Sequence, residues 1–332
     1  MDALLPTIWA GILAFGILVY VVLDGFDLGI GILFGTTGNE HYRRQMMSAI
    51  APVWDGNETW LLVIGAGLFA TFPVVYAIFL SAFYLPVILL LIALIFRGVA
   101  FEFRHKTESM RWLWDWGFFL GSAVATFVQG AAIGAMVNEL PVEDGRFVGT
   151  PFFWLTPFAV TCGVGLILGF CLLGATWLIL KTEGEVRDWA YRRAPWLLGA
   201  VLVFLAVVFV YALVLKLEIM QRWIDRPILW LFPLVGAAAA AGCYQGIRHQ
   251  HDRVPFAMTV VIFLCAFGTM AVSFWPYMVP YSLTVEQAAA PTSSLAFMFY
   301  GAGLFIIPLI LVYTIIVYWV FRGKISPTDH YG

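Results

Sequence analysis

Seven ionisable side chains stand inside or beside apolar stretches that are long enough to cross a membrane. They are Asp24, Asp27, Asp55, Glu58 and Arg97, with Glu102 and Asp115 closer to the expected membrane surface. A charged group in the hydrocarbon region costs about 3 kcal/mol on insertion scales, so each one needs a partner, water or a function. Buried carboxylates can relay protons, and a nearby arginine keeps one of them ionised. We therefore predict that the first five form a proton pathway and that the last two are its entrance.

The spacing of the acidic residues supports this interpretation. Asp24 and Asp27 are three residues apart, as are Asp55 and Glu58, which puts each pair on one face of a helix. Asp24 comes about 16 residues after the expected start of its helix, or about 24 Å along the axis. That depth lies below the middle of the bilayer. All seven side chains are expected at the same membrane face, as a proton entrance from the cytoplasm requires.

Each of these residues also has a purely structural explanation. Asp55 follows Pro52 in a first helical turn, where a carboxylate complements the helix dipole. Arg97 lies near a helix end and can extend its guanidinium to the membrane surface. Glu102 and Asp115 are compatible with solvated or ion-paired surface positions. The sequence leaves these explanations open beside the proton pathway.

The chain offers no ligand set for haem or another metal. Haem iron in a helical bundle is usually held by His, sometimes by Met or Cys. The five histidines fall in predicted loops or in the tail: His41, His105, His249, His251 and His330. The cysteines Cys162, Cys171, Cys243 and Cys265 lie inside apolar runs without CxxC spacing. We therefore expect this chain to ligate no haem and no metal.

The elements that position these residues are predicted to be transmembrane helices. Of the 332 residues 62% are hydrophobic and 11% are charged, which lies outside the range of a soluble domain. Backbone polar groups inside a bilayer must be satisfied within the element, so apolar runs of about 20 residues are helices. We predict an all-α integral membrane protein with about nine spans. They are Ile8–Phe34, Ala51–Tyr76, Ile78–Phe101, Trp114–Glu139, Phe153–Leu180, Pro195–Lys216, Pro227–Ile247, Pro255–Val279 and Ser294–Phe321.

We expect one transmembrane domain over residues 1–332, with no room for a soluble domain. Helices one to four and five to eight share an orientation, and the segment around Gly25 loosely resembles that around Gly174. This similarity favours a weak internal repeat of residues 1–140 and 151–280, that is, two four-helix bundles with helix 294–321 at the periphery. The second copy lacks both carboxylates, so the chemistry is expected in the first.

The distribution of Lys and Arg predicts the orientation in the membrane, because short loops rich in them stay in the cytoplasm. With the N-terminus outside, the cytoplasmic segments hold 14 of the 18 Lys and Arg. An odd number of spans then puts the N-terminus in the periplasm and the C-terminus in the cytoplasm. The first apolar run lacks a cleavage site and is expected to stay as a span. No basic cluster exceeds two adjacent residues, so nucleic acid is not an expected partner.

Four ordered motifs carry a resemblance to a known family. DGFDLG (24–29), PVWDGNETWL (52–61), FRGVAFEFR (96–104) and WDWG (114–117) resemble, in that order, signature stretches of subunit II of cytochrome bd-type quinol oxidases. PYMVP (276–280) and the run from Thr292 to YWVFRGK are similar too. The resemblance therefore covers nearly the whole chain.

The resemblance implies a haem-free subunit of a terminal oxidase complex that oxidises quinol and reduces oxygen to water, in the bacterial inner membrane. In such complexes subunit I binds two b-type haems and one d-type haem, and subunit II supports it. The family also implies a cytoplasmic proton pathway in subunit II, onto which Asp24, Asp27, Asp55, Glu58 and Arg97 map by motif position. Small accessory subunits, lipid and a bound quinone are further expected partners. The connection Leu217–Arg226 is short, as in the compact cyanide-insensitive branch.

Two other functions remain open at this point. Intramembrane carboxylates also suit a proton-coupled transporter, although the charges lie at one face and not at a midplane site between repeats. The chain could alternatively be a structural membrane subunit whose acidic residues only pair with Arg97 or with solvent. The subunit content of the complex that purifies with this chain separates the transporter from the two subunit readings.

Overall fold

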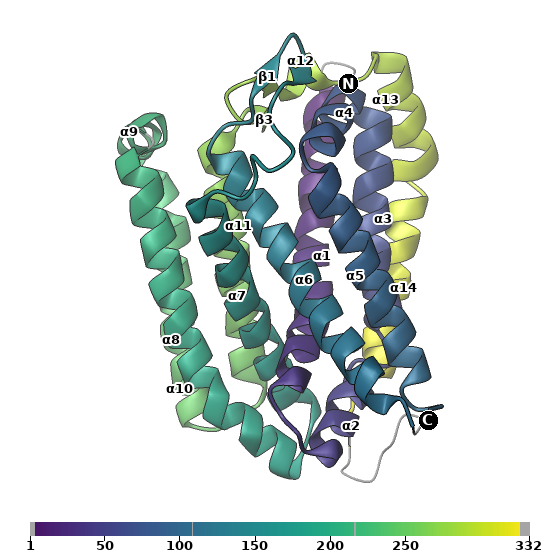
Figure 1. The fold of residues 1–332 in the computed structure, drawn as a ribbon. Coiled ribbons are helices and arrows are strands. Elements are labelled where there is room, and N and C mark those ends of the chain that lie inside the picture. The colour runs from purple at the N-terminus through teal and green to yellow at the C-terminus, as the bar shows by residue number, and fades with distance from the viewer. Residues whose placement is uncertain (1–3, 108, 216, 326–332) are drawn as a thin grey trace.

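The computed structural model describes residues 4–107, 109–215 and 217–325. In this part of the chain eight helical segments are long and apolar enough to cross a membrane. They are α1 (Leu5–Gly35), α5 (Tyr84–Phe103), α6 (Arg111–Val137), α7 (Pro157–Lys181), α8 (Gly184–Leu215), η2 with α10 (Pro227–Trp230, Leu231–Arg248), α11 (Arg253–Phe274), and α13, η3 and α14 (Thr292–Met298, Phe299–Gly303, Ile306–Val320). A less apolar helix, α3 (Trp54–Thr71), runs alongside α1 and α14 (Figure 1). The prediction of an all-α integral membrane protein with about nine spans is confirmed.

The predicted boundary between the second and third spans, near Tyr76, is wrong. α3 ends at Thr71, a short helix α4 (Pro73–Ala82) follows, and α5 starts only at Tyr84. Pro73 has no amide hydrogen to continue α3, and proline drives the residue before it out of the helical region. Phe72 accordingly has φ −135° and ψ 62°.

Other predicted ends also moved. The eighth span stops at Phe274 and not at Val279, because Pro276 cannot continue a helix and residues Tyr277–Val279 form a strand. The sixth begins earlier than Pro195, at Gly184, with Pro195 inside the helix, and its predicted end at Lys216 lies outside the described residues. The short connection expected at 217–226 forms a helix, α9 (Leu217–Asp225).

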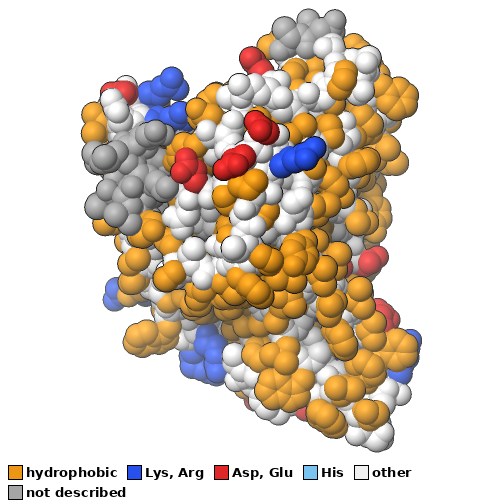
Figure 2. Space-filling model, turned by 45° about the horizontal axis from the view of Figure 1, so that its top comes forward, with side chains coloured by type: hydrophobic (Ala, Val, Ile, Leu, Met, Phe, Trp, Pro, Cys, Tyr) orange, Lys and Arg blue, Asp and Glu red, His pale blue; other side chains and the backbone are white. Residues whose placement is uncertain are grey.

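The two ends of the bundle differ in structure. One end, named the hairpin end, carries the antiparallel hairpins β1–β2 (Val142–Glu143, Arg146–Phe147) and β3–β4 (Tyr277–Val279, Leu283–Thr284), together with α12 (Val285–Ala288). The other, named the basic end, carries α2 (Glu40–Ser48), the α7–α8 and α10–α11 connections and the end of α14 (Figure 1). In Figure 2 charged side chains gather towards the ends, and the surface between them is mostly apolar.

Helices α1 and α7 cross in close backbone contact at the centre of the bundle. The last third of α1, from Asp24 to Phe34, is buried throughout. At Gly29 an added Cβ would lie 1.8 Å from the Phe170 backbone oxygen, and at Gly174 it would lie 2.7 Å from the Ile30 backbone nitrogen. Membrane helices associate through such small residues because lipid provides no hydrophobic drive. These are the first helices of the two predicted repeat units; the repeat itself stays a prediction.

A short strap after α14 ties this helix to the basic end. Lys181, the last residue of α7, donates to the backbone oxygens of Phe321 and Gly323, and the Ile325 amide donates to the Lys181 oxygen at 2.7 Å. Lys324 in turn forms an ion pair with Asp252 at 2.5 Å. α14 has no fully buried side chain of its own, so these contacts help to hold it at the edge of the bundle.

Asp252 anchors the strap from the α10–α11 connection. Arg187 Nη2 and the Tyr191 hydroxyl both lie 2.8 Å from its carboxylate, in addition to Lys324. Burial raises the pKa of Asp252, but the hydrogen bonds from Arg187, Lys324 and Tyr191 outweigh it and lower the pKa to about 2. The carboxylate is therefore a charged tie between the strap and the α8 helix.

Replacement of Gly29 by alanine is expected to destabilise the assembled protein by about 1–3 kcal/mol, the usual cost of overpacking. Gly11→Ala, on the same helix, meets no atom within 4 Å and should be neutral or stabilising. Thermal unfolding of the two purified variants checks this. Equal midpoints would show that the α1–α7 crossing tolerates a wider separation.

Asp252→Asn is expected to lower the unfolding temperature, and the loss should depend on pH. A carboxylate whose pKa is depressed in the folded state stabilises the protein fully above its ordinary pKa of 3.8, and this contribution is lost as the pH falls towards about 2. The gap between wild type and variant should therefore be constant at neutral pH and shrink below pH 3.8. Asp225→Asn, at an exposed carboxylate of α9, is the matched control. A gap that widens on acidification would contradict the assignment.

Candidate proton-transfer site

Arg97 lies at the centre of a buried cluster of charged side chains. Its Nη2 is 3.6 Å from Asp24 Oδ1 on α1, and its Nη1 forms an ion pair with Glu58 on α3. The Arg97 and Asp24 side chains are 1% and 0% exposed, whereas Glu58 is 23% exposed. The guanidinium also faces the Trp54 ring, 5.8 Å from its centroid. Three helices therefore meet at one arginine, and the cluster reaches the surface of the chain at Glu58.

Close helix packing directs Arg97 inward. Gly121 of α6 faces α5 at this level, and a Cβ there would lie 2.6 Å from the Ala93 oxygen and 3.0 Å from Arg97 Cβ. Ala93, Leu94 and Arg97 share the buried face of α5. The explanation that Arg97 only extends to the membrane surface is therefore wrong. Its guanidinium instead neutralises carboxylates inside the bundle.

Asp27 belongs to a second branch of the site. Asn57 Nδ2 donates to Asp27 Oδ2 at 2.7 Å and to the Leu23 backbone oxygen at 3.3 Å. The Tyr318 hydroxyl donates to Asn57 Oδ1 at 3.0 Å, which connects α14 to this branch. Sequence reasoning missed Asn57 and Tyr318. Asn57 stands between Asp55 and Glu58 in the same motif, so its amide in a membrane span was a signal that the sequence offered. Tyr318 lies among other aromatic residues, and its sequence position offered no such signal.

Several buried polar atoms of the cluster have no hydrogen-bond partner at normal geometry among the described residues. They are both carboxylate oxygens of Asp24, Oδ1 of Asp27, and Nε and Nη2 of Arg97. Buried polar groups are nearly always satisfied, by protein or by water. Only a small group that both donates and accepts can serve a carboxylate and a guanidinium together, and water is such a group. The cluster therefore has the chemistry of a hydrated proton-transfer site.

Asp55 does not join the buried cluster. It lies exposed in the first turn of α3, where its charge complements the helix dipole. The structure thus brings together Asp24, Asp27, Glu58 and Arg97 and leaves Asp55 at the surface near the start of the same helix. Its part in a proton pathway stays a prediction.

A separate ion-pair network occupies the basic end. Arg104, buried to 1% exposure, bonds Asp115 Oδ1 at 2.6 Å and Glu40 Oε2 at 2.7 Å, while Arg43 bonds the other Asp115 oxygen at 2.7 Å. Burial raises the pKa of Glu40, but hydrogen bonding and charge attraction from Arg104 outweigh it and leave the pKa lowered. Glu102 lies half-buried beside this network. Asp115 is thus ion-paired, as its structural explanation required, and the entrance formed by Glu102 and Asp115 stays a prediction.

The described histidines lie at the basic end of the bundle. Among the described residues no group of three or more His, Cys, Asp or Glu is placed to hold a metal ion. His41 lies in α2, and His105, His249 and His251 lie in connections at the basic end, while His330 lies outside the described residues. The four described histidines therefore lie outside the membrane-spanning helices.

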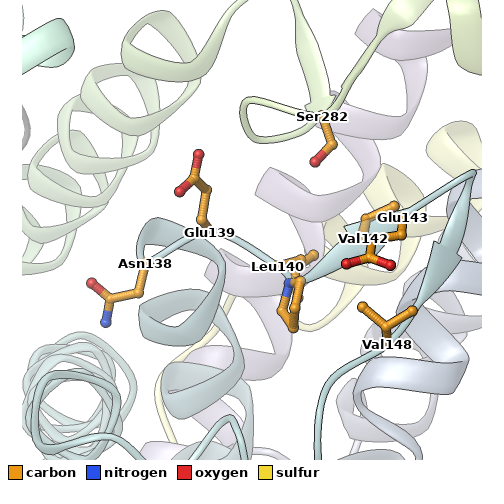
Figure 3. Close-up of a pocket in the computed structure, with 8 residues that line it drawn as sticks. Asn138, Glu139, Leu140, Val142, Glu143, Val148 and Ser282 are labelled. Carbon is orange, nitrogen blue, oxygen red and sulfur yellow. The ribbon is translucent and has the colours of Figure 1, made fainter.

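An open cavity of about 460 Å³ lies at the hairpin end. It is lined by the end of α6 and β1, including Asn138, Glu139 and Glu143, with Ser282 from the β3–β4 turn opposite (Figure 3). No basic side chain lines it. The cavity lies at the C-terminal end of α6, beyond Gly121, which packs against Arg97. It is therefore separate from the candidate site.

The helices and the buried acid–arginine cluster define an integral membrane protein with ionisable groups inside its bundle. Comparison with known proteins identifies the family: residues 5–321 match the cytochrome bd terminal oxidase subunit II family, and the chain belongs to it. It is therefore a subunit of a terminal quinol oxidase, an oxidoreductase complex with at least one other subunit.

Individual relatives agree along the whole length. The chain is 33% identical to cytochrome bd-I ubiquinol oxidase subunit 2 of Escherichia coli, over 96% of this chain and 94% of that one. It is 31% identical to cytochrome bd ubiquinol oxidase subunit 2 of Bacillus subtilis, over 98% of each. The solved structure of bd oxidase from Geobacillus thermodenitrificans has the same fold, with a TM-score of 0.78 at 15% identity, over 96% of this chain and 99% of that one. The predicted resemblance is confirmed, and the transporter alternative is not supported.

Removal of the Arg97 charge should strongly destabilise the bundle, because it leaves Asp24 buried without a counter-charge. Arg97→Gln is expected to cost about 3–5 kcal/mol, the usual penalty for breaking a buried pair. Adding Asp24→Asn should restore part of the loss, since the uncompensated charge is then gone. Thermal unfolding of the two single variants and the double variant measures this coupling; strictly additive effects would show that the two groups do not interact.

Proposed function

We propose that this chain supports a haem-bearing oxidase subunit and carries protons from the cytoplasm towards the oxygen-reducing site through Asp24, Asp27, Glu58 and Arg97. The observation that carries the proposal is the buried cluster itself: two carboxylates face one guanidinium where three helices meet. Such groups are costly in a membrane unless they serve a function. Asp55, and the entrance residues Glu102 and Asp115, extend the proposed pathway to the basic end.

The geometry suits proton uptake from one side. Glu58 lies in the second turn of α3 and is the partly exposed member of the cluster. Asp24 lies 11 residues before the end of α1, about 16 Å deeper than the basic end of that helix. A proton taken up at Glu58 therefore meets Arg97 and then Asp24 on its way inward. Exposed Asp55, one turn before Glu58, supplies a collecting carboxylate at the surface.

The charge distribution supports the basic end as the cytoplasmic face. The α2 helix, the α5–α6, α7–α8 and α10–α11 connections and the strap all lie there, and together with the helix ends next to them they hold most of the Lys and Arg residues. α1 begins at the opposite end, so the N-terminus would lie in the periplasm and the C-terminus in the cytoplasm. The protein is a multi-pass protein of the bacterial inner membrane, and this orientation is part of the proposal.

A haem-bearing subunit I is the proposed partner. Oxygen reduction by a cytochrome requires iron, and the bundle described here has no imidazole to hold it. The two b-type haems and one d-type haem implied by the resemblance would therefore belong to subunit I. No described residue points to a site for a quinone or for a small accessory subunit, so those partners stay predictions. A purely structural role for the acidic cluster is the alternative that experiment must separate.

The proposal is tested by quinol-driven oxygen consumption of the purified complex carrying Asp24→Asn or Asp55→Asn. Loss of a proton-transferring group costs about a hundredfold or more when no substitute exists. Asp24→Asn, at the fully buried site, is expected to lower turnover at least about tenfold, and Asp55→Asn to lower it less, because water can replace an exposed carboxylate. The haem absorption spectrum and subunit content should stay unchanged in both.

Asp188→Asn, at an exposed carboxylate outside the cluster, serves as the control and should turn over at the wild-type rate. Wild-type turnover in Asp24→Asn, with the complex intact, would leave the acidic cluster with a structural role only.

A further inference from the structure

The buried polar groups do not end at Asp24. Tyr20 precedes Asp24 by one helical turn on the same face of α1 and is 4% exposed. Gln129 of α6 donates from Nε2 to the Tyr20 hydroxyl at 3.0 Å. A tyrosine hydroxyl and an amide are thus placed side by side in spans that are otherwise apolar, where polar groups are costly unless paired.

These two residues extend the cluster away from the basic end. Gln129 lies 18 residues after Arg111, the first residue of α6, or about 27 Å along the helix from the basic end. Glu58 lies closer to that end, because its neighbour Asn57 bonds Asp27, which is 8 residues, or about 12 Å, before the end of α1. The series Glu58, Arg97, Asp24, Tyr20 and Gln129 therefore runs from the Arg97 cluster further into the bundle.

The burial of this series is lowest at its two ends. Arg97, Asp24 and Tyr20 are between 0% and 4% exposed. Glu58 and Gln129, by contrast, are only partly buried. A series of polar groups that is sealed in the middle and open at both ends is the arrangement of a path with an entrance and an exit.

We propose that Tyr20 and Gln129 form the exit of the proton path, an inference that rests on the proposed function. The Gln129 amide occupies one lone pair of the Tyr20 oxygen and so fixes the hydroxyl. The other lone pair accepts a proton from Asp24 as the original hydroxyl proton leaves to a water molecule on the exposed side of Gln129. One O–H bond breaks on Asp24, one forms and one breaks on Tyr20, and the water gains the proton, so the tyrosine is unchanged after each transfer.

In this scheme Tyr20 carries the proton and Gln129 is a positioning residue. The structural alternative is that the Gln129–Tyr20 bond only joins α1 to α6, as polar side chains do between membrane helices. A structural bond affects assembly and stability, whereas an exit affects the rate and isotope sensitivity of proton delivery. These consequences can be measured separately.

The test uses the complete oxidase complex with Tyr20→Phe, Gln129→Leu and Gln129→Glu. Tyr20→Phe removes the hydroxyl and is expected to lower oxygen consumption about fivefold or more, and Gln129→Leu about twofold. The solvent deuterium isotope effect on turnover should rise in both, because proton transfer becomes rate-limiting. Gln129→Glu with a protonated carboxyl can still donate to the Tyr20 hydroxyl and should restore turnover. The haem spectrum and subunit content report assembly.

Two matched controls accompany these variants. Tyr313→Phe removes a hydroxyl from an exposed tyrosine of α14, and Thr126→Val removes a buried hydroxyl of α6 that bonds only the Ser122 oxygen among the described residues. Both should keep the wild-type rate and isotope effect.

The outcomes separate this inference from the proposed function. If Asp24→Asn is slow while Tyr20→Phe and Gln129→Leu match wild type in rate and isotope effect, the exit is wrong and the cytoplasmic part of the path stands. If the two variants lose turnover without any change in isotope effect, the bond is structural and the exit is likewise overturned. Wild-type turnover in Asp24→Asn would overturn both proposals. If Tyr20→Phe does not assemble, Gln129→Leu and Gln129→Glu, at a half-buried position, decide between an exit and a structural bond.

Discussion

The organisation of this subunit depends on the burial of one guanidinium inside a membrane. A lone charge there is costly, so Arg97 must meet carboxylates, and it meets Asp24 and Glu58 from two other helices. The requirement fixes the relative positions of α1, α3 and α5. It also explains the close packing at Gly121, because the backbones must approach before the side chain of Arg97 can turn inward.

The ion pairs at the basic end differ from those around Arg97. Arg104 and Asp252 form ion pairs with two or three partners each, and these pairs hold α2 and the strap in place. In the cluster around Arg97 the hydrogen bonds are incomplete, and several carboxylate and guanidinium atoms lack a partner among the described residues. Complete pairs are suited to stability, whereas incomplete ones leave groups free to exchange protons with water.

Much of this could be predicted from the sequence, and the failures have identifiable causes. The number of helices could be predicted from the apolar runs, because the thickness of the bilayer sets how many apolar residues one span needs. Boundaries failed at Pro73 and Pro276, where local chain geometry overrode hydropathy. The sequence predicted that Arg97, Asp24 and Glu58 lie at the same membrane face. It could not predict that they pair, because distances between helices depend on tertiary packing. Asn57 and Tyr20 gave no charge signal, and their roles appear only when helices α1, α3 and α6 are brought together.

Infrared difference spectroscopy of the complex, comparing oxidised and reduced states, tests the central claim most directly, because it reports protonation of carboxyl groups. If Asp24 exchanges protons during turnover, the difference spectrum should contain a carboxyl C=O band that shifts in deuterated water and disappears in Asp24→Asn. The band should persist in Asp188→Asn. A spectrum without such a band, or one that Asp24→Asn leaves unchanged, would contradict the account.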